Sequence, residues 1–293
     1  VDDLQLSITH VIRAEEHLSN TPRQQLCAEA LGYKLPLFAH VPMILAPDRS
    51  KLSKRHGATS VEEFRSEGYL PEALINYMAL LGWSPGGEEE MFNLDELIAM
   101  FSLERVNKTA AIYDVGKLSW MNSHYMRDYD LDRLAEAALP FFSDKNLLEP
   151  PLDKEQNSYF KKVIAMVRER ARTLIELAED SRYFYTDQFD YEEKGVKKHF
   201  LKNEDVPQLL RKAAEALDSL ESFTLESVEG AYRTLSEELN ISTGKLIHPT
   251  RLALTGRTVG PGLYDLMILL GQDQAVGRLK KAASAIEKGE VTI

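Results

Sequence analysis

Lys51 and Lys54 lie three residues apart in a short polar segment, residues 51–57, that follows an apolar run. Lysine ammonium groups held on such a segment can reach phosphate oxygens as point charges. An isolated Lys-x-x-Lys pair is more often part of a solvated basic loop. The rest of the chain must therefore decide between a phosphate site and an ordinary surface loop.

A second polar cluster follows another apolar run and contains Arg13, Glu15, Glu16 and His17. A guanidinium such as that of Arg13 can bind a carboxylate through two parallel hydrogen bonds. Together the two clusters suit a nucleotide phosphate and a small carboxylate ligand, provided that the fold brings them to one place.

The elements that would bring the clusters together form a predicted β-α-β unit. Residues 4–12 and 38–46 are expected to be strands, the second interrupted by Pro42. Between them a helix is expected to begin with Thr21 as N-cap and Pro22 at its first position. Strands joined in this way run parallel with a right-handed crossover. Because open parallel sheets bind ligands beyond the carboxyl ends of their strands, both clusters should face one crevice.

The following residues are predicted to be mostly helical. Ser60 with Glu63, and Asn93 with Glu96, match the capping box that begins a helix. Trp120 is expected to lie in the core, because apolar residues surround it in the sequence.

From residue 130 onward almost only helices are expected. Residues 156–180 predict one long amphipathic helix, with Arg168 and Arg170 on either side of its apolar stripe. Residues 255–262 are rich in glycine and predict a turn between helices, followed by an apolar segment from 263 to 270.

The composition is that of a soluble globular chain of 293 residues with a net charge of −11. The single cysteine, Cys27, excludes an internal disulfide and a zinc site built from several cysteines, and it fits a cytoplasmic protein. No apolar run approaches the length of a membrane span. Charge is unevenly spread over one acidic block (Glu88, Glu89, Glu90, Asp95, Glu96) and two basic blocks (Lys161, Lys162, Arg168, Arg170, Arg172; Lys245, Arg251, Arg257, Arg278, Lys280, Lys281).

Several segments in this order resemble bacterial-type glutamyl-tRNA synthetases, a class I family. Residues 51–55 look like the family's version of the KMSKS loop, and the resemblance covers essentially the whole chain. The segments that carry it are residues 11–17, 20–24, 51–55, 68–74, 120–122 and 252–256.

The resemblance implies ATP-dependent activation of glutamate to glutamyl-adenylate, followed by transfer to the terminal ribose of tRNA(Glu). Lys51 and Lys54 correspond to the catalytic loop lysines that stabilise charge on the ATP phosphates. Such chemistry depends on positioning and cationic stabilisation rather than on a protein nucleophile. Magnesium is expected to be carried by ATP, without a dedicated protein metal site and without zinc.

By the same resemblance, Arg13 would bind the carboxylate of the amino acid. Glu16 and His17 would lie against the ribose and adenine of ATP, and Ile44 would form part of the adenine wall. The family often has an aromatic residue where His17 stands.

Four other positions match residues that contact the anticodon in the family. Arg170 corresponds to the arginine that selects the third anticodon base, and its presence favours an enzyme selective for glutamate anticodons over glutamine anticodons. Arg251, Pro261 and Leu263 match further anticodon contacts. Sequence-specific RNA recognition usually targets unstacked bases in single-stranded loops, and the basic blocks become candidate phosphate contacts.

The expected fold is mainly α, with a partial α/β Rossmann-like nucleotide fold at its start and an all-helical anticodon-binding region. The expected domains are the second half of the catalytic nucleotide fold (1–46), the KMSKS-type loop with a stem-contact domain (47–129), and two helical anticodon-binding domains (130–187 and 188–293).

The family's His-x-Gly-His motif has no counterpart in this sequence. We therefore expect a carboxyl-terminal portion that binds tRNA but does not aminoacylate it alone. Expected partners are tRNA(Glu), glutamate and ATP, with no membrane, and the expected state is a monomer.

Two alternatives remain open at this stage. One is a non-catalytic tRNA-binding module derived from a synthetase. The other is a relative of glutaminyl-tRNA synthetase, whose anticodon region consists of β-barrels. A helical second half would argue against that relative.

Overall fold

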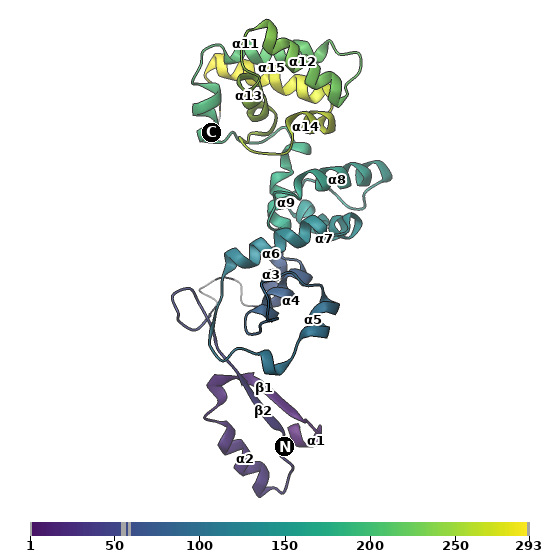
Figure 1. The fold of residues 1–293 in the computed structure, drawn as a ribbon. Coiled ribbons are helices and arrows are strands. Elements are labelled where there is room, and N and C mark those ends of the chain that lie inside the picture. Colours follow the sequence, from purple (N-terminus) through teal and green to yellow (C-terminus); the bar gives the residue numbers. More distant parts are fainter. Residues whose placement is uncertain (1, 54–56, 58–59, 292–293) are drawn as a thin grey trace. The chain divides into compact units, whose positions relative to one another are not determined.

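The fold is shown in Figure 1 as a computed structural model that describes residues 2–53, 57 and 60–291. The chain divides into two units, Val1–Asp128 and Tyr129–Ile293. Lys54, one of the two predicted loop lysines, lies outside the described residues. The expected fold class is confirmed, because helices dominate and strands occur only in the first unit of the described chain.

The first unit contains four short strands and six α-helices in its described residues. In chain order its elements are α1 (Asp2–Gln5), β1 (His10–Ala14), the 3-10 helix η1 (Glu15–His17), α2 (Thr21–Ala30), β2 (Leu37–Val41), β3 (Ile44–Leu45), α3 (Val61–Ser66), α4 (Pro71–Leu80), α5 (Leu94–Met100), η3 (Leu103–Arg105), β4 (Ala111–Ile112) and α6 (Val115–Asp128).

The predicted β-α-β unit is confirmed, with β1 and β2 parallel and Arg13 paired with His40. The strand predicted over residues 4–12 is wrong in its first half. Asp2 and Asp3 lie in the first turn of α1, where carboxylates favour a helix N-terminus, and Leu6 N donates to Asp2 O. The alternation of apolar and polar residues over positions 4–8 therefore predicted a strand that is not formed there.

The second predicted strand, residues 38–46, is divided in two at Pro42. β2 ends at Val41, because proline has no N–H with which to continue the ladder. The chain then forms β3, which pairs in parallel with β4 rather than with β1.

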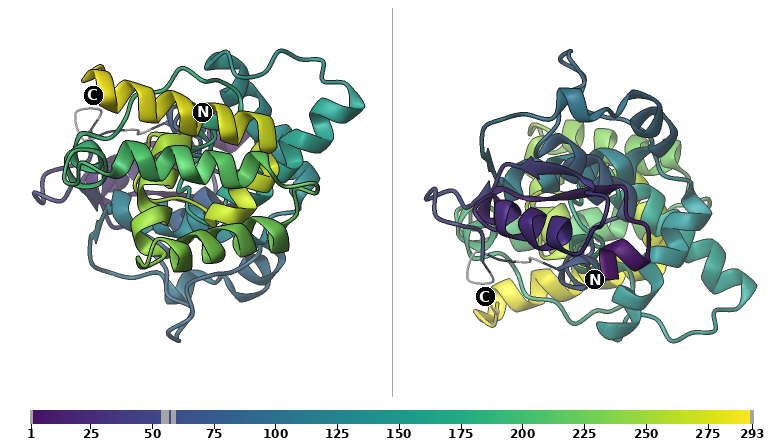
Figure 2. Two further views of the ribbon diagram at one scale, coloured as in Figure 1. Left: turned by 90° about the horizontal axis from the view of Figure 1, so that it is seen from above. Right: turned by 90° about the horizontal axis from the view of Figure 1, so that it is seen from below.

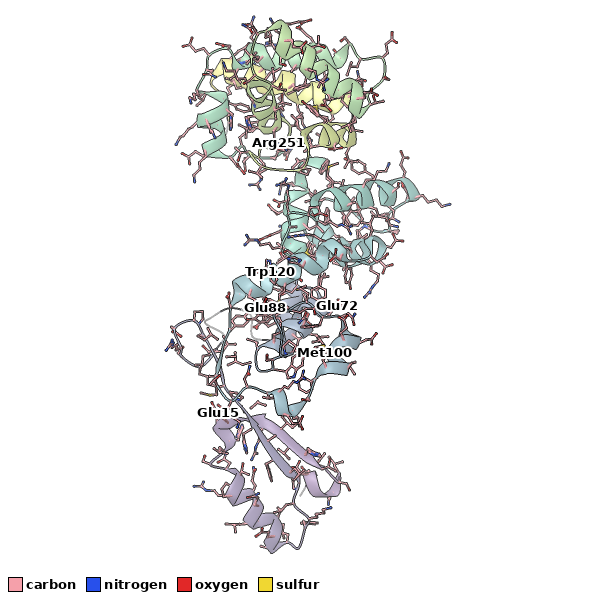
Figure 3. All side chains as sticks on the ribbon, viewed as in Figure 1. Glu15, Glu72, Glu88, Met100, Trp120 and Arg251 are labelled. Atoms are coloured by element: carbon pink, nitrogen blue, oxygen red, sulfur yellow. The ribbon has the colours of Figure 1, made fainter. Side chains whose placement is uncertain are left out.

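Both predicted capping boxes are confirmed, at Ser60 with Glu63 and at Asn93 with Glu96. The prediction that Trp120 lies in the core is wrong, because its side chain is 43% exposed. Trp120 projects from α6 (labelled in Figure 3), and its ring meets the edge of the His124 ring at 4.6 Å. The buried face of α6 is instead the one that carries Leu118, Met121, Asn122 and Met126.

The second unit is helical throughout its described residues. In chain order its elements are α7 (Leu131–Asp144), α8 (Lys154–Val167), α9 (Leu174–Asp180), η4 (Arg182–Phe184), α10 (Glu193–Gly195), the π-helical turn η5 (Val196–Phe200), α11 (Val206–Asp218), α12 (Leu225–Glu238), α13 (Gly244–Thr255), α14 (Leu263–Leu270) and α15 (Gln272–Lys288). Figure 2 shows α11 running alongside α15, with α12 and α13 packed on α11.

The single long helix predicted over residues 156–180 is wrong. α8 ends at Val167, and a turn closed by the hydrogen bond from Arg170 N to Val167 O separates it from α9. Thr173 begins α9 as its N-cap, with its hydroxyl accepting from Glu176 N at 3.2 Å. Arg170 consequently lies on an exposed turn rather than on a helix.

Arg278 on α15 is buried, with 4% of its side chain exposed. Its guanidinium donates to Leu254 O at 2.6 Å, to Tyr183 O at 2.7 Å, to Thr186 O at 3.2 Å and to a carboxylate oxygen of Asp187 at 2.8 Å. Burial alone would raise the pKa of Asp187, but the hydrogen bond and charge of Arg278 lower it below its ordinary value. Arg278 therefore has a structural role and is not a phosphate contact.

We expect Arg278→Ala to lower the free energy of unfolding by about 3 kcal/mol, because it leaves buried carbonyl oxygens without donors. Lys280→Ala is the matched control, since Lys280 forms only an exposed ion pair with Asp218 and should cost under about 0.5 kcal/mol. Urea unfolding measures both values. Equal stabilities for the two variants would contradict the structural role of Arg278.

Candidate functional site

The two polar clusters of the first unit meet through Glu16 and Lys51. Glu16 lies in η1, directly after β1, and its Oε2 is 2.5 Å from Lys51 Nζ. Lys51 forms an antiparallel β-bridge with Leu45 of β3. Ala46 N donates to Ser50 O at 2.8 Å, which closes the turn between them. The predicted convergence of both clusters at the carboxyl ends of the strands is therefore present in the structure.

The hydrogen bond and positive charge of Lys51 lower the pKa of Glu16. The Glu16 and Lys51 side chains are 39% and 65% exposed, so water screens their attraction. This exposure leaves the Lys51 ammonium group able to exchange its carboxylate partner for another anion.

Arg13 is held on β1 by side chains of α2. One terminal nitrogen of its guanidinium donates to Thr21 Oγ1 at 2.8 Å and to Gln24 Oε1 at 2.7 Å. The guanidinium also lies over the Phe38 ring, 5.4 Å from its centroid. The guanidinium plane is therefore fixed, and Arg13 Nε is buried without a hydrogen-bond partner among the described residues.

Thr21 does not act as an N-cap, contrary to the sequence prediction. Asn20 holds the N-cap position of α2, without a side-chain capping bond. The Thr21 hydroxyl donates to His17 O at 3.1 Å and accepts from Arg13, so it is already engaged with the site.

His17 lies in η1 and Ile44 on β3. His17 Nε2 is 3.7 Å from Glu16 Oε1. Ile44 is 40% exposed on β3, opposite Ala111 of β4. An exposed apolar side chain beside charged groups can cover the flat face of a ligand ring, while its backbone remains fixed in the sheet.

The second unit brings two of the four predicted anticodon residues, Arg251 and Pro261, into contact. Arg251 of α13 donates to Pro261 O at 2.6 Å. Burial lowers the pKa of Arg251, and the positive charge of Arg170 lowers it further. Burial raises the pKa of the Tyr183 hydroxyl, and the positive charges of Arg251 and Arg170 oppose this shift.

Leu263, the fourth predicted residue, begins α14 and is 5% exposed. Its side chain packs into the helical core, so only its backbone could face a ligand. The buried Leu263 side chain therefore holds the end of the turn that follows α13.

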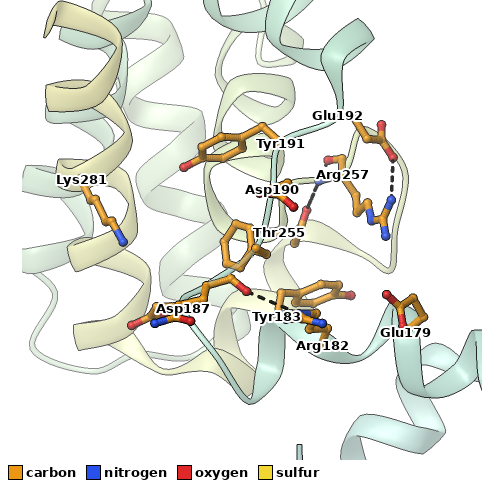
Figure 4. A pocket seen from close by; sticks show the side chains of 12 residues that line it. Glu179, Arg182, Tyr183, Asp187, Asp190, Tyr191, Glu192, Thr255, Arg257 and Lys281 are labelled. Atoms are coloured by element: carbon orange, nitrogen blue, oxygen red, sulfur yellow. Dashed lines mark hydrogen bonds and ion pairs between the residues drawn. The ribbon is translucent and has the colours of Figure 1, made fainter. Parts of the chain in front are cut away.

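A cavity of about 640 Å³ lies beside this turn and is shown in Figure 4. Arg182, Arg257 and Lys281 contribute positive charge to its wall, and Glu179 and Glu192 are among its acidic residues. Sequence reasoning missed Glu192, because no local motif marks it and its contacts are with residues 64 to 66 positions further along the chain.

Among the residues that the structure describes, no group of three or more His, Cys, Asp or Glu side chains is arranged to hold a metal ion. None of the described helices has the length and apolar character that crossing a membrane requires.

Two family models match the chain. The model of an anticodon binding domain matches residues 133–283, and the model of the catalytic domain of class I tRNA synthetases (E and Q) matches residues 1–120. The two matches fall on the helical second unit and on the first unit, respectively.

Curated relatives support the same family. The chain is 58% identical over 288 residues to a glutamate–tRNA ligase of Moorella thermoacetica, covering 98% of this chain and 59% of that protein. It is 56% identical to glutamate–tRNA ligase 2 of Thermoanaerobacter pseudethanolicus, with the same coverage. The chain thus spans about 59% of the length of these relatives.

A solved structure has the same fold. The crystal structure of a glutamate tRNA ligase from Elizabethkingia meningosepticum in complex with its amino acid superposes with a TM-score of 0.82 at 32% identity. The match covers 97% of this chain and 59% of that one.

We expect Lys51→Ala to raise the pKa of Glu16 toward the ordinary glutamate value, because the variant removes the ammonium group that favours the carboxylate. The Glu16–Lys51 attraction should be present above that ordinary value and should disappear as the pH falls through the lowered pKa. An NMR titration of the Glu16 side-chain carboxyl measures the shift.

Lys34→Ala is the control for this titration, since Lys34 is an exposed lysine of the same unit. Its Glu16 titration should match that of the unchanged chain. If Lys51→Ala also leaves the titration unchanged, the two polar clusters do not meet in solution.

Proposed function

This chain belongs to the glutamate–tRNA ligase family, and we propose that it serves an enzyme that uses ATP to attach glutamate to tRNA(Glu). The observation that carries the proposal is the hydrogen bond from Arg251 to Pro261 on the turn after α13, in the unit that matches an anticodon binding domain. Activation would give glutamyl-adenylate, and transfer to the terminal ribose of the tRNA would follow.

Lys51, at the edge of the first unit, would stabilise the ATP phosphates as pyrophosphate leaves, and the family resemblance assigns the same role to Lys54. Lys51 would exchange the carboxylate of Glu16, 2.5 Å away, for a phosphate oxygen. Glu16 would then be free to accept hydrogen bonds from the ribose hydroxyls. Magnesium would arrive bound to ATP, since phosphate oxygens and water are its usual ligands.

Around this phosphate site, His17 and Ile44 would border the adenine, with Ile44 contributing its exposed apolar face. Arg13 would bind the carboxylate of glutamate. Its fixed orientation against Thr21 and Gln24 supports that role, because a guanidinium that is already ordered loses little entropy on binding.

In the second unit, Arg170 would donate to the edge of the third anticodon base. Its position on an exposed turn suits this role better than a helix would, because the side chain can extend toward an unstacked base. Arg251 and Pro261 would form the adjoining surface, and the backbone at Leu263 would complete it.

The second unit is helical in its described residues, which argues against a relative of glutaminyl-tRNA synthetase with an anticodon region of β-barrels. We further propose a monomeric cytoplasmic protein with domain boundaries near residues 46, 129 and 187. The exposed Trp120, together with the His124 ring that it contacts, then lies in the domain proposed to contact the tRNA stem.

We expect this chain to bind tRNA(Glu) and to lose affinity when the third anticodon base is changed. Arg170→Ala should remove most of that discrimination, about tenfold, because a charged donor to a base edge contributes roughly 1–3 kcal/mol. Fluorescence anisotropy across a salt series measures both effects.

Arg170→Lys and Lys162→Ala are the matched controls. Arg170→Lys keeps the charge but loses the planar fork, so discrimination should fall while the salt dependence is retained. Lys162 is an exposed lysine of α8, and its loss should weaken both tRNAs equally. Discrimination that survives Arg170→Ala would contradict the proposed role of Arg170.

A further inference from the structure

The turn between α13 and α14, residues 256–262, rests against a distant segment, residues 189–195. Gly256 adopts a left-handed conformation with φ of 72°. A Cβ atom there would lie 2.4 Å from Asp190 O and 2.9 Å from the Phe189 ring. A Cβ atom on Gly195 would similarly lie 2.7 Å from a methyl group of Thr258. The turn and the segment are therefore packed without spare room.

Glu192 makes the polar contacts between the two stretches. One oxygen of its carboxylate accepts from Thr258 N at 3.0 Å and from Thr258 Oγ1 at 2.6 Å. The other oxygen lies 3.8 Å from the Arg257 guanidinium, a pair visible in Figure 4. Its backbone N donates to Gly256 O at 2.8 Å. One residue thus holds three successive residues of the turn.

The carboxylate is well suited to this task. Hydrogen bonds to an ionised acceptor are stronger than those between neutral groups. The Glu192 side chain is 33% exposed, so its bonds are partly shielded from water. Glu192 is also the N-cap residue of α10, but its side chain makes no capping bond there, which leaves both oxygens for the turn.

The far end of the same turn is tied to α13. Arg251 donates to Pro261 O at 2.6 Å, and a Cβ atom on Gly260 would approach Arg251 to 3.2 Å. Pro261 follows Thr258 by three residues, so a displacement of Thr258 would also displace the Pro261 carbonyl that accepts the hydrogen bond from Arg251. Glu192 therefore helps to set the position of Arg251.

From this geometry we propose that Glu192 is a positioning residue for anticodon recognition. It fixes the 256–262 turn, and through it Pro261 and Arg251, without itself contacting the RNA. The inference rests on the proposed function, because it assigns Glu192 a role in the RNA recognition proposed there.

The test compares tRNA(Glu) binding by the unchanged chain and by Glu192→Ala, using the natural anticodon and anticodons altered at each of the three positions. Glu192→Ala should reduce the ratio between natural and altered anticodons about tenfold, the effect of losing one charge-assisted hydrogen bond. Affinity for the altered tRNAs should stay within about twofold, because nonspecific phosphate contacts are retained.

Glu193→Ala is the matched control. Glu193 is the next residue, and its carboxylate pairs with Lys197 one helical turn away. This variant removes the same charge from the same segment, so it should leave the ratio unchanged. A loss of discrimination in Glu193→Ala equal to that in Glu192→Ala would overturn the proposal.

Thr258→Val provides a second route if Glu192→Ala folds poorly, as judged by circular dichroism and thermal melting. Valine removes the hydroxyl donor and preserves the side-chain shape. Thr258→Val should also reduce the ratio, and the double variant should lose no more than Glu192→Ala alone, because both act on one contact. Full discrimination in Thr258→Val, or a double variant that loses the sum of two separate losses, would overturn the proposal.

The outcomes separate this inference from the function on which it rests. If the unchanged chain discriminates anticodons and Glu192→Ala does so equally well, the positioning role fails and the proposed function stands. If the unchanged chain binds all anticodons alike, both are overturned.

Discussion

The buried guanidinium of Arg278 is the interaction on which the second unit depends. A buried guanidinium is stable only when its donors are paired, and here its acceptors come from the end of α13 and from residues 183–187. These contacts fix the point at which the turn leaves α13 and the segment that leads to Glu192. The surface proposed for anticodon recognition is therefore supported from within the helical core.

The first unit is organised differently. Its polar edge is connected by an exposed ion pair between Glu16 and Lys51, whereas the Arg13 guanidinium is held by several partners. The exposed Lys51 and the firmly held Arg13 suit the proposed reaction, in which phosphate charge changes while the amino acid stays in place. The first unit thus has an exposed polar edge, whereas the turn after α13 in the second unit is held by several contacts.

Local signals in the sequence predicted local structure well. The two capping boxes and the turn before Leu263 depend on neighbouring residues, and these predictions were confirmed. The parallel strand pair, which follows from the strand–helix–strand order, was also confirmed. Predictions failed where a longer pattern concealed a local one. The continuous apolar stripe over residues 156–180 predicted one helix, although Thr173 begins a new helix as an N-cap. The apolar residues around Trp120 in the sequence predicted that it is buried, although its side chain is exposed.

Part of the candidate site could be predicted and part could not. Motif and spacing predicted that Arg13, Glu16 and Lys51 belong to one polar site, and the structure brings Glu16 and Lys51 together. Glu192 and Arg278 were missed or misassigned because their partners lie far along the chain. A sequence shows that a residue is charged but not whether its charge faces water or a buried carbonyl, and only the fold supplies that information.

The central claim is that the second unit recognises the anticodon of a tRNA. Chemical probing of the Watson–Crick edges of tRNA(Glu) bases, with and without the chain, tests it most directly. The account predicts protection concentrated at the anticodon, since unstacked loop bases are the part of RNA that proteins recognise by sequence. Protection confined to the stems, with the anticodon bases equally reactive in the complex, would contradict it.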